Sequence, residues 1–204
     1  MSNIRFKPFI GSTYKKQDFK LLTLGESHYF GSGDMANFKA DESSMSTVTQ
    51  DVVKRYLDYK IGKGNFENWM SNYTKYGNVV AGKQMSSKET IDFWNSTSFY
   101  NYVQAPTANP RVSPTKQEFT DSIEPFKKVL KNLNPDLVIL WGHRLWNHFP
   151  KDHYVSKLEQ EGNKIHYLEF NKRTPILVVP HPSSSQFNYS LTSEINNYIE
   201  LIKK

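Results

Sequence analysis

The chain has 204 residues, of which 37% are hydrophobic and 14% aromatic, a length and composition that suit one globular domain over residues 1–204. It contains no cysteine, which excludes a disulfide framework, a cysteine-ligated metal or cluster, and a thiol nucleophile. Lys and Arg number 26 against 20 Asp and Glu, and this net charge of +6 favours a polyanionic partner such as nucleic acid.

The first half of the chain predicts one strand followed by a group of helices. Residues 1–18 form an irregular lead-in without the apolar core of a signal peptide, and no run approaches the roughly 18 apolar residues of a membrane span. A strand is expected over 19–24, where an apolar run stops at a glycine. From about 46 to 96, helical spacing predicts three helices, the third opened by a capping box from Ser86 to Glu89. We expect a cytoplasmic protein with no membrane partner.

The second half of the chain alternates strands with helices. A short aromatic strand near 98–102 runs into a Pro-rich loop, and an amphipathic helix over 113–135 precedes a continuously apolar strand at 136–142. A short helix, two more strands with the sequences KIHYLEF and TPILVVP, and a final helix LTSEINNYIELI follow. This alternation predicts a three-layer α/β fold with a central, mainly parallel sheet of about four strands.

Polar side chains follow three of the predicted strands. The segment GESHY, Gly25–Tyr29, comes directly after the first strand, Asn101 lies at the end of the second, and His181 follows the last. Ligands bind outside the carboxyl ends of parallel strands, where loops that are distant in sequence meet. The sequence therefore predicts one site built from these three loops.

In their order and strand context, these segments resemble the motifs of the uracil-DNA glycosylase superfamily. GESHY is similar to its first motif, which reads GQDPY in one branch and GEAPG in another, and His181–Ser183 matches the closing HPS motif. The stretch around Asn101 resembles the strand that carries the family's base-reading Asn. The likeness spans about 19–200, interrupted by a helical insertion at about 37–90. It implies a monomeric glycosylase that hydrolyses uracil or a related base in DNA without a metal or cofactor.

The resemblance also implies roles for individual residues. Glu26 would be the catalytic carboxylate, and His181 would donate a hydrogen bond to the departing base. Asn101 would read the edge of a base that is flipped out of the DNA stack. The other residues expected to bind substrate are Gly25, Ser27, His28, Tyr29 and Phe30. The residues expected to contact DNA phosphates are Arg111, Lys116, Ser183, Ser184 and Ser185.

A departure from the family pattern at Ser27 leaves other functions open. Ser27 stands where the GQDPY branch has its water-activating Asp, and a hydroxyl is not a base at neutral pH without help, so the chain could be a catalytically silent relative that binds nucleic acid or protein. Tyr29 corresponds to a ring that excludes a 5-methyl group, which argues against thymine as the target. A serine hydrolase using Ser27, His181 and Glu26 is a third possibility, although no G-x-S-x-G elbow surrounds Ser27.

The helical insertion mixes lysines with aromatic residues. This combination is typical of surfaces that grip a nucleic-acid backbone and stack on bases. A lysine-rich helix is also the ordinary appearance of a solvated face, so both interpretations of the insertion stay open.

Overall fold

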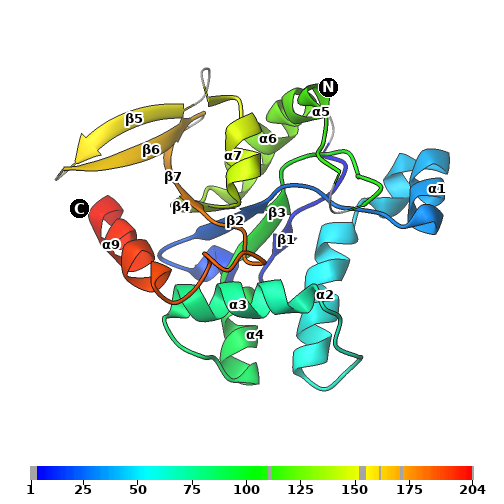
Figure 1. Cartoon of the computed structure of the whole chain (residues 1–204), viewed down its shortest axis with the longest axis horizontal. Coiled ribbons are helices and arrows are strands. Elements are labelled where there is room, and N and C mark those ends of the chain that lie inside the picture. The colour runs from blue at the N-terminus through cyan, green and yellow to red at the C-terminus, as the bar shows by residue number, and fades with distance from the viewer. Residues whose placement is uncertain (1–3, 110–111, 152–154, 161, 171, 204) are drawn as a thin grey trace.

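The computed structural model describes residues 4–109, 112–151, 155–160, 162–170 and 172–203. In these ranges, strands form one mixed sheet with helices on both of its faces (Figure 1). The strands are β1 (Phe9–Ile10), β2 (Leu21–Gly25), β3 (Ser98–Asn101), β4 (Leu137–Trp141), β5 (Val155–Gln160), β6 (Asn163–Glu169) and β7 (Arg173–Val179). The helices are α1 (Ser32–Ala40), α2 (Val48–Lys60), α3 (Met70–Ala81), α4 (Ser87–Ser96), α5 (Lys116–Asp121), α6 (Ile123–Leu133), α7 (His143–His148) and α9 (Leu191–Lys203).

The centre of the sheet is parallel. The described part of the chain gives a seven-stranded sheet in the order β1-β3-β2-β4-β7-β6-β5, and the neighbours from β3 to β7 pair in parallel. This arrangement confirms the predicted α/β class. The paired registers bring Gly25 opposite Asn101 and Trp141 opposite Val179, so that the carboxyl ends of all four parallel strands lie at the same edge.

The predicted sheet of about four strands is too small. β1 adds to β3, β6 adds to β7, and β5 adds to β6, each in antiparallel pairing. β1 has only two residues, too few for a periodic pattern, and β5 carries alternating charged residues on a hairpin that extends from the body of the protein (Figure 1). The strand KIHYLEF was predicted, but it runs antiparallel to β7 because it is one arm of this hairpin.

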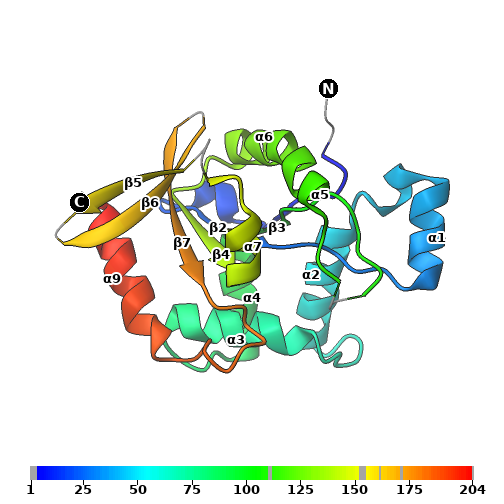
Figure 2. The same ribbon diagram turned by 45° about the horizontal axis from the view of Figure 1, so that its top comes forward.

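Alternate residues of β2 pack into different cores, because successive side chains of a strand point to opposite faces. Leu22 and Leu24 belong to the core that includes residues of α5, α6 and α7. Leu21 belongs to the core on the other face, with residues of α2, α3, α4 and α9. On this second face the Thr23 hydroxyl donates a hydrogen bond to the Tyr76 hydroxyl, 2.8 Å away. Figure 2 shows the helices on the two sides of the sheet.

The segment at about 37–90, predicted to be helical, contains the end of α1, a short 3-10 helix (Glu42–Met45), α2, α3 and the start of α4. The predicted capping box of α4 is confirmed, with the Ser86 hydroxyl accepting from the Glu89 amide and the Glu89 carboxylate accepting from the Ser86 amide. α3 begins and ends later in the chain than the second of the three predicted helices, which was expected over 66–76. It is capped by Gly82, whose φ of 69° suits a glycine just after a helix C-terminus.

The amphipathic helix predicted over 113–135 is divided into α5 and α6 at Ser122. The Ser122 hydroxyl donates to the Glu118 carbonyl at 2.6 Å and accepts from the Gln104 amide at 3.0 Å. These bonds tie the break between the helices to the loop after β3. In the described ranges, no helix combines the length and the apolar character needed to cross a membrane.

Candidate functional site

Backbone hydrogen bonds hold the two predicted motifs around Glu26 and Asn101 side by side. The amides of Tyr102 and Val103 donate to the carbonyls of Gly25 and Glu26, at 2.9 and 2.8 Å. Further along, the Thr107 amide donates to the His28 carbonyl at 2.8 Å. The loop after β2 therefore continues the pairing of β2 with β3 beyond the sheet. These bonds hold the two loops together at the carboxyl edge.

Gly25 makes room for the amide of Asn101. A Cβ atom at position 25 would lie 2.2 Å from Oδ1 of Asn101, closer than two such atoms can approach. The glycine is thus required by this close approach and not by an unusual backbone angle. Asn101 itself is 7% exposed. Its side chain lies across the end of β2, immediately before Glu26.

His28 is buried next to the side-chain amide of Asn101. Its Nε2 lies 2.8 Å from the Thr49 hydroxyl of α2, and Nδ2 of Asn101 lies 3.2 Å from each of the two ring nitrogens. The edge of the His28 ring meets Phe6 at 5.2 Å between ring centroids. Burial lowers the pKa of His28 to about 3, so the ring is neutral at pH 7. His28 therefore connects the loop after β2 to Asn101 and to α2.

Glu26 is paired with an arginine that the sequence analysis did not single out. Nε of Arg144 donates to Oε2 of Glu26 at 2.8 Å, and Nη2 donates to Oε1, which makes the pair bidentate. The Glu26 side chain is 11% exposed and that of Arg144 is 46% exposed. Arg144 lies in the first turn of α7, directly after β4. Its place just past the end of a predicted parallel strand was the signal that could have identified it.

His181 lies beyond β7, and its ring orientation is set by its own loop. The Ser183 amide donates to Nδ1 of His181 at 3.1 Å, and the Ser183 hydroxyl lies 2.7 Å from the same nitrogen. Because a backbone N–H can only donate, Nδ1 of the neutral ring carries no proton and Nε2 carries it. Partial burial and then the positive charge of Arg144 lower the pKa of His181 below its usual value.

The loop that contains Ser183, Ser184 and Ser185, called the serine loop below, is anchored to α3. Nζ of Lys75 on α3 donates to the Ser184 carbonyl at 2.7 Å, and the Ser184 amide donates to the His181 carbonyl at 2.8 Å. The side chains of Ser183 and Ser185 are exposed, as phosphate contacts would require, and Ser184 is half-buried. α9 begins at 191, so its N-terminus does not directly follow these serines.

The remaining predicted residues differ in how far they are exposed. Lys116 is exposed in the first turn of α5, and Arg111 lies outside the described residues. Tyr29 is 53% exposed, whereas Phe30 is 3% exposed and packs against other rings. Ser27 is half-buried, and in the described part of the chain no hydrogen bond joins it to His181. The contact required by the serine hydrolase alternative is thus not formed.

The site is therefore a polar, partly charged cluster at the carboxyl edge of the parallel strands of an α/β protein. The sequence matches no known family model and no curated protein. Among the described residues, no group of three or more His, Asp and Glu side chains is arranged to hold a metal ion. The function has to be argued from the side chains themselves: a carboxylate, an amide and a neutral imidazole from three different loops.

Proposed function

We propose that the protein is a DNA glycosylase that hydrolyses the N-glycosidic bond of uracil or a related base flipped out of DNA. The observation that carries this proposal is that Glu26, Asn101 and His181 lie at the carboxyl ends of the parallel strands β2, β3 and β7, at one edge of the sheet. Arg144 links two of them, since it pairs with Glu26 and its charge acts on His181. The resemblance of GESHY and HPS to the motifs of uracil-DNA glycosylases supports the same assignment.

In the proposed reaction, water attacks C1′ of the sugar while the bond from C1′ to the base nitrogen breaks. The bonding electron pair leaves with the base, and positive charge develops on the sugar ring. The Glu26 carboxylate orients the water, offsets this positive charge and receives the proton of the water. A carboxylate has about four lone-pair sites, of which the bidentate pair with Arg144 uses two, so that the others remain for water.

His181 stabilises the departing base in this mechanism. Its Nε2–H donates to the base oxygen on which negative charge develops, which is the principle of an oxyanion hole. A neutral donor suits this role, because burial and Arg144 keep the pKa of the ring low. The Ser183 amide at Nδ1 fixes the tautomer that presents the proton to the substrate.

Asn101 recognises the flipped base. A side-chain amide offers one acceptor and one donor, which matches the edge of a pyrimidine such as uracil. Gly25 on one side and His28 on the other hold the amide in place. An amide that is held in place cannot turn to suit a different base. A mismatched base would therefore leave polar atoms of Asn101 unpaired, and this cost discriminates against it.

A catalytically silent, nucleic-acid-binding relative is the second candidate. Two observations favour it: Ser27 stands in the place of the family's Asp, and the Glu26 carboxylate is already engaged by Arg144. In this case the same site would bind an unpaired base without cleaving it. The two candidates differ in one measurable product, the abasic site.

The test is a panel of labelled oligonucleotides, each with one non-standard base, assayed for abasic-site formation in single and double strands. We expect cleavage at uracil or a related base, and we expect Glu26→Gln and His181→Ala each to lower it at least ~100-fold. Glu159→Gln, an exposed substitution on β5, is the matched control and should retain full activity. Unchanged turnover in both site variants would refute the mechanism, and binding without any cleavage would establish the silent alternative.

A further inference from the structure

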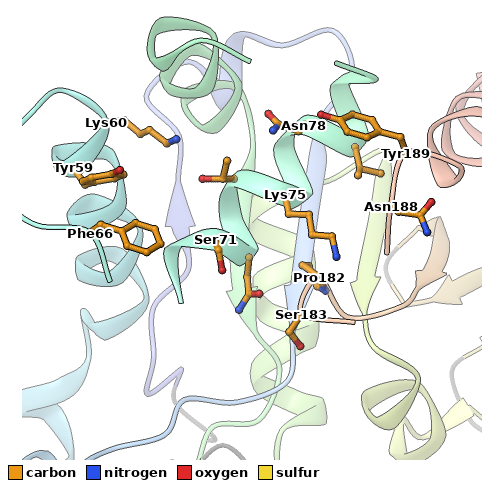
Figure 3. A pocket seen from close by; sticks show the side chains of 13 residues that line it. Tyr59, Lys60, Phe66, Ser71, Lys75, Asn78, Pro182, Ser183, Asn188 and Tyr189 are labelled. Carbon is orange, nitrogen blue, oxygen red and sulfur yellow. The ribbon is translucent and has the colours of Figure 1, made fainter. Parts of the chain in front are cut away.

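A groove lies beside the candidate site, and of its lining residues the mechanism above uses only Ser183. It has a volume of about 660 Å³, within the roughly 300–1,000 Å³ typical of ligand sites (Figure 3). Residues of α2 and the loop after it line one side, α3 lines the middle, and the loop between β7 and α9 lines the other side. The lining residues are Tyr59, Lys60, Phe66, Ser71, Asn72, Thr74, Lys75, Asn78, Val79, Pro182, Ser183, Asn188 and Tyr189.

The charge of the groove suits an anion. Two lysines, Lys60 and Lys75, line it, and its lining residues include no Asp or Glu. Partial burial lowers the pKa of Lys60, so this ammonium group has lost part of its hydration and gains more from a bound anion than an exposed lysine would. Its Nζ lies 5.5 Å from the centroid of the Tyr56 ring and 5.8 Å from that of Tyr59. The lysine is thus held among aromatic rings.

Exposed rings border the same groove. Phe66 is 51% exposed and Tyr189 is 50% exposed, at opposite ends of the group of lining residues (Figure 3). Tyr59 packs against Phe66, with their ring centroids 5.6 Å apart. Aromatic side chains that line a hollow are a common feature of ligand-binding sites. Aromatic faces next to lysines are the combination that binds unpaired bases and their phosphates.

The groove is continuous with the candidate site. Ser183 lines the groove and also holds Nδ1 of His181 through its amide and hydroxyl. Lys75 lines it as well, and its ammonium group donates to the Ser184 carbonyl. A chain of nucleotides with one base at His181 would therefore leave the candidate site along the serine loop and enter the groove.

We propose that this groove binds a single-stranded segment of nucleic acid next to the nucleotide held in the candidate site. Bases stack on Phe66 and Tyr189, and phosphates lie near Lys60 and Lys75. A paired duplex does not expose the faces of its bases, so stacking on these rings selects an unpaired strand. The direction in which the strand leaves the candidate site rests on the proposed function. Binding of a strand in the groove does not require catalysis.

The test measures binding of fluorescently labelled, undamaged oligothymidylate by anisotropy. Phe66→Ala and Tyr189→Ala should each weaken binding by roughly 5- to 150-fold, the range measured for losing one base–aromatic stack. Lys60→Gln should lower the slope of log affinity against log salt by about 0.7, the value for one phosphate contact on a single strand. Leu158→Ala and Lys157→Gln are matched controls on β5, exposed and away from the groove, and should bind like the parent protein (Figure 1).

The outcomes separate this inference from the proposed function. If the groove variants bind oligothymidylate as the parent does, or if the controls lose as much affinity, the groove is not the strand site. Equal loss of duplex and single-strand binding in the ring variants would also overturn it. A protein that forms no abasic site, yet loses strand binding in Phe66→Ala, would keep the groove and refute the glycosylase. Normal excision together with unaffected strand binding in both ring variants would refute the groove as the strand site and keep the glycosylase.

Discussion

Two neighbouring parts of the candidate site are built in opposite ways. The inner corner, formed by Gly25, His28 and Asn101, is uncharged and buried, and its atoms are held by close contacts. The outer pair, Glu26 and Arg144, is ionic, and the arginine is 46% exposed. The inner corner is enclosed by close contacts, while the outer pair faces water on the side of the arginine.

The difference follows from the cost of burying charge. An ionised group loses several kcal/mol of hydration in the interior unless it is paired, whereas a neutral ring with a hydrogen-bond partner loses much less. His28 therefore stays neutral inside, and the carboxylate and guanidinium meet at the edge where water still reaches them. The comparison suggests a division of labour in which the inner corner positions the ligand and the outer pair supplies charge.

The largest expected effect is on the pH dependence of the free energy of unfolding, and it tests whether the inner corner excludes charge. The folded-state pKa of His28 is about 3 and its unfolded value is about 6.5, so between these values the unfolded chain binds a proton that the folded chain does not. Stability is then highest above pH 6.5 and falls as the pH decreases, by about 3 kcal/mol at pH 4. Urea unfolding from pH 7 to pH 4 measures this loss.

The matched variant for this prediction is His28→Gln, which keeps a polar side chain but cannot titrate. Its unfolding free energy should depend less steeply on pH than that of the parent between pH 6.5 and 4. Identical slopes for the two proteins would mean that His28 is protonated in the folded state. The inner corner would then be open to charge, and the contrast with the outer pair would disappear.

A somewhat smaller effect is expected from crowding the inner corner. Gly25→Ala places a Cβ against Oδ1 of Asn101 and should destabilise the fold by about 1–3 kcal/mol, the usual cost of overpacking. Asn101→Gly removes the obstructing amide, so the double variant should lose less stability than the two single losses added together. Gly33→Ala in α1, where an added Cβ meets nothing within 4 Å, is the control and should not destabilise the protein.

The smallest effect on stability is expected from the outer pair. Arg144→Gln should reduce the free energy of unfolding by about 1 kcal/mol, because a partly exposed ion pair contributes little. The pKa of His181 should nevertheless rise toward its usual value, because one of the two causes that lower it is removed. An NMR titration of the His181 ring measures this change. Arg173→Gln, which breaks an exposed pair with Glu169 on the hairpin, should leave the His181 titration unchanged.

The sequence predicted most elements of the parallel core, because long apolar runs such as Leu137–Trp141 are hard to place anywhere else than in a buried strand. It missed β5, in which Lys157, Leu158 and Glu159 are exposed and the continuous apolar run of a buried strand is missing. It also joined α5 and α6, since the apolar spacing continues across Ser122. The break lies three residues before Pro125, which cannot donate a backbone hydrogen bond to Asp121, so this interruption could have been read from the sequence. The hydrogen bond from the Gln104 amide to Ser122, 18 positions away, is the part that no local pattern contains.

The candidate site shows the same limit. The sequence analysis singled out Glu26, Asn101 and His181 because Asn101 ends a predicted strand and the other two follow one, and strand ends meet at one edge of a parallel sheet. Arg144 was not found, although it bonds to Glu26, because the pairing joins residues 118 positions apart. The groove was not predicted either, since its two sides come from the insertion and from the serine loop.

From local periodicity and composition alone, the sequence determined the α/β class, the capped helices and the strand ends that carry polar groups. The tertiary structure decided which of those groups touch, which charges are paired and which rings stay exposed. The physical reason is that hydrophobic spacing acts over a few residues, whereas hydrogen bonds, burial and pKa values depend on neighbours that only folding brings together.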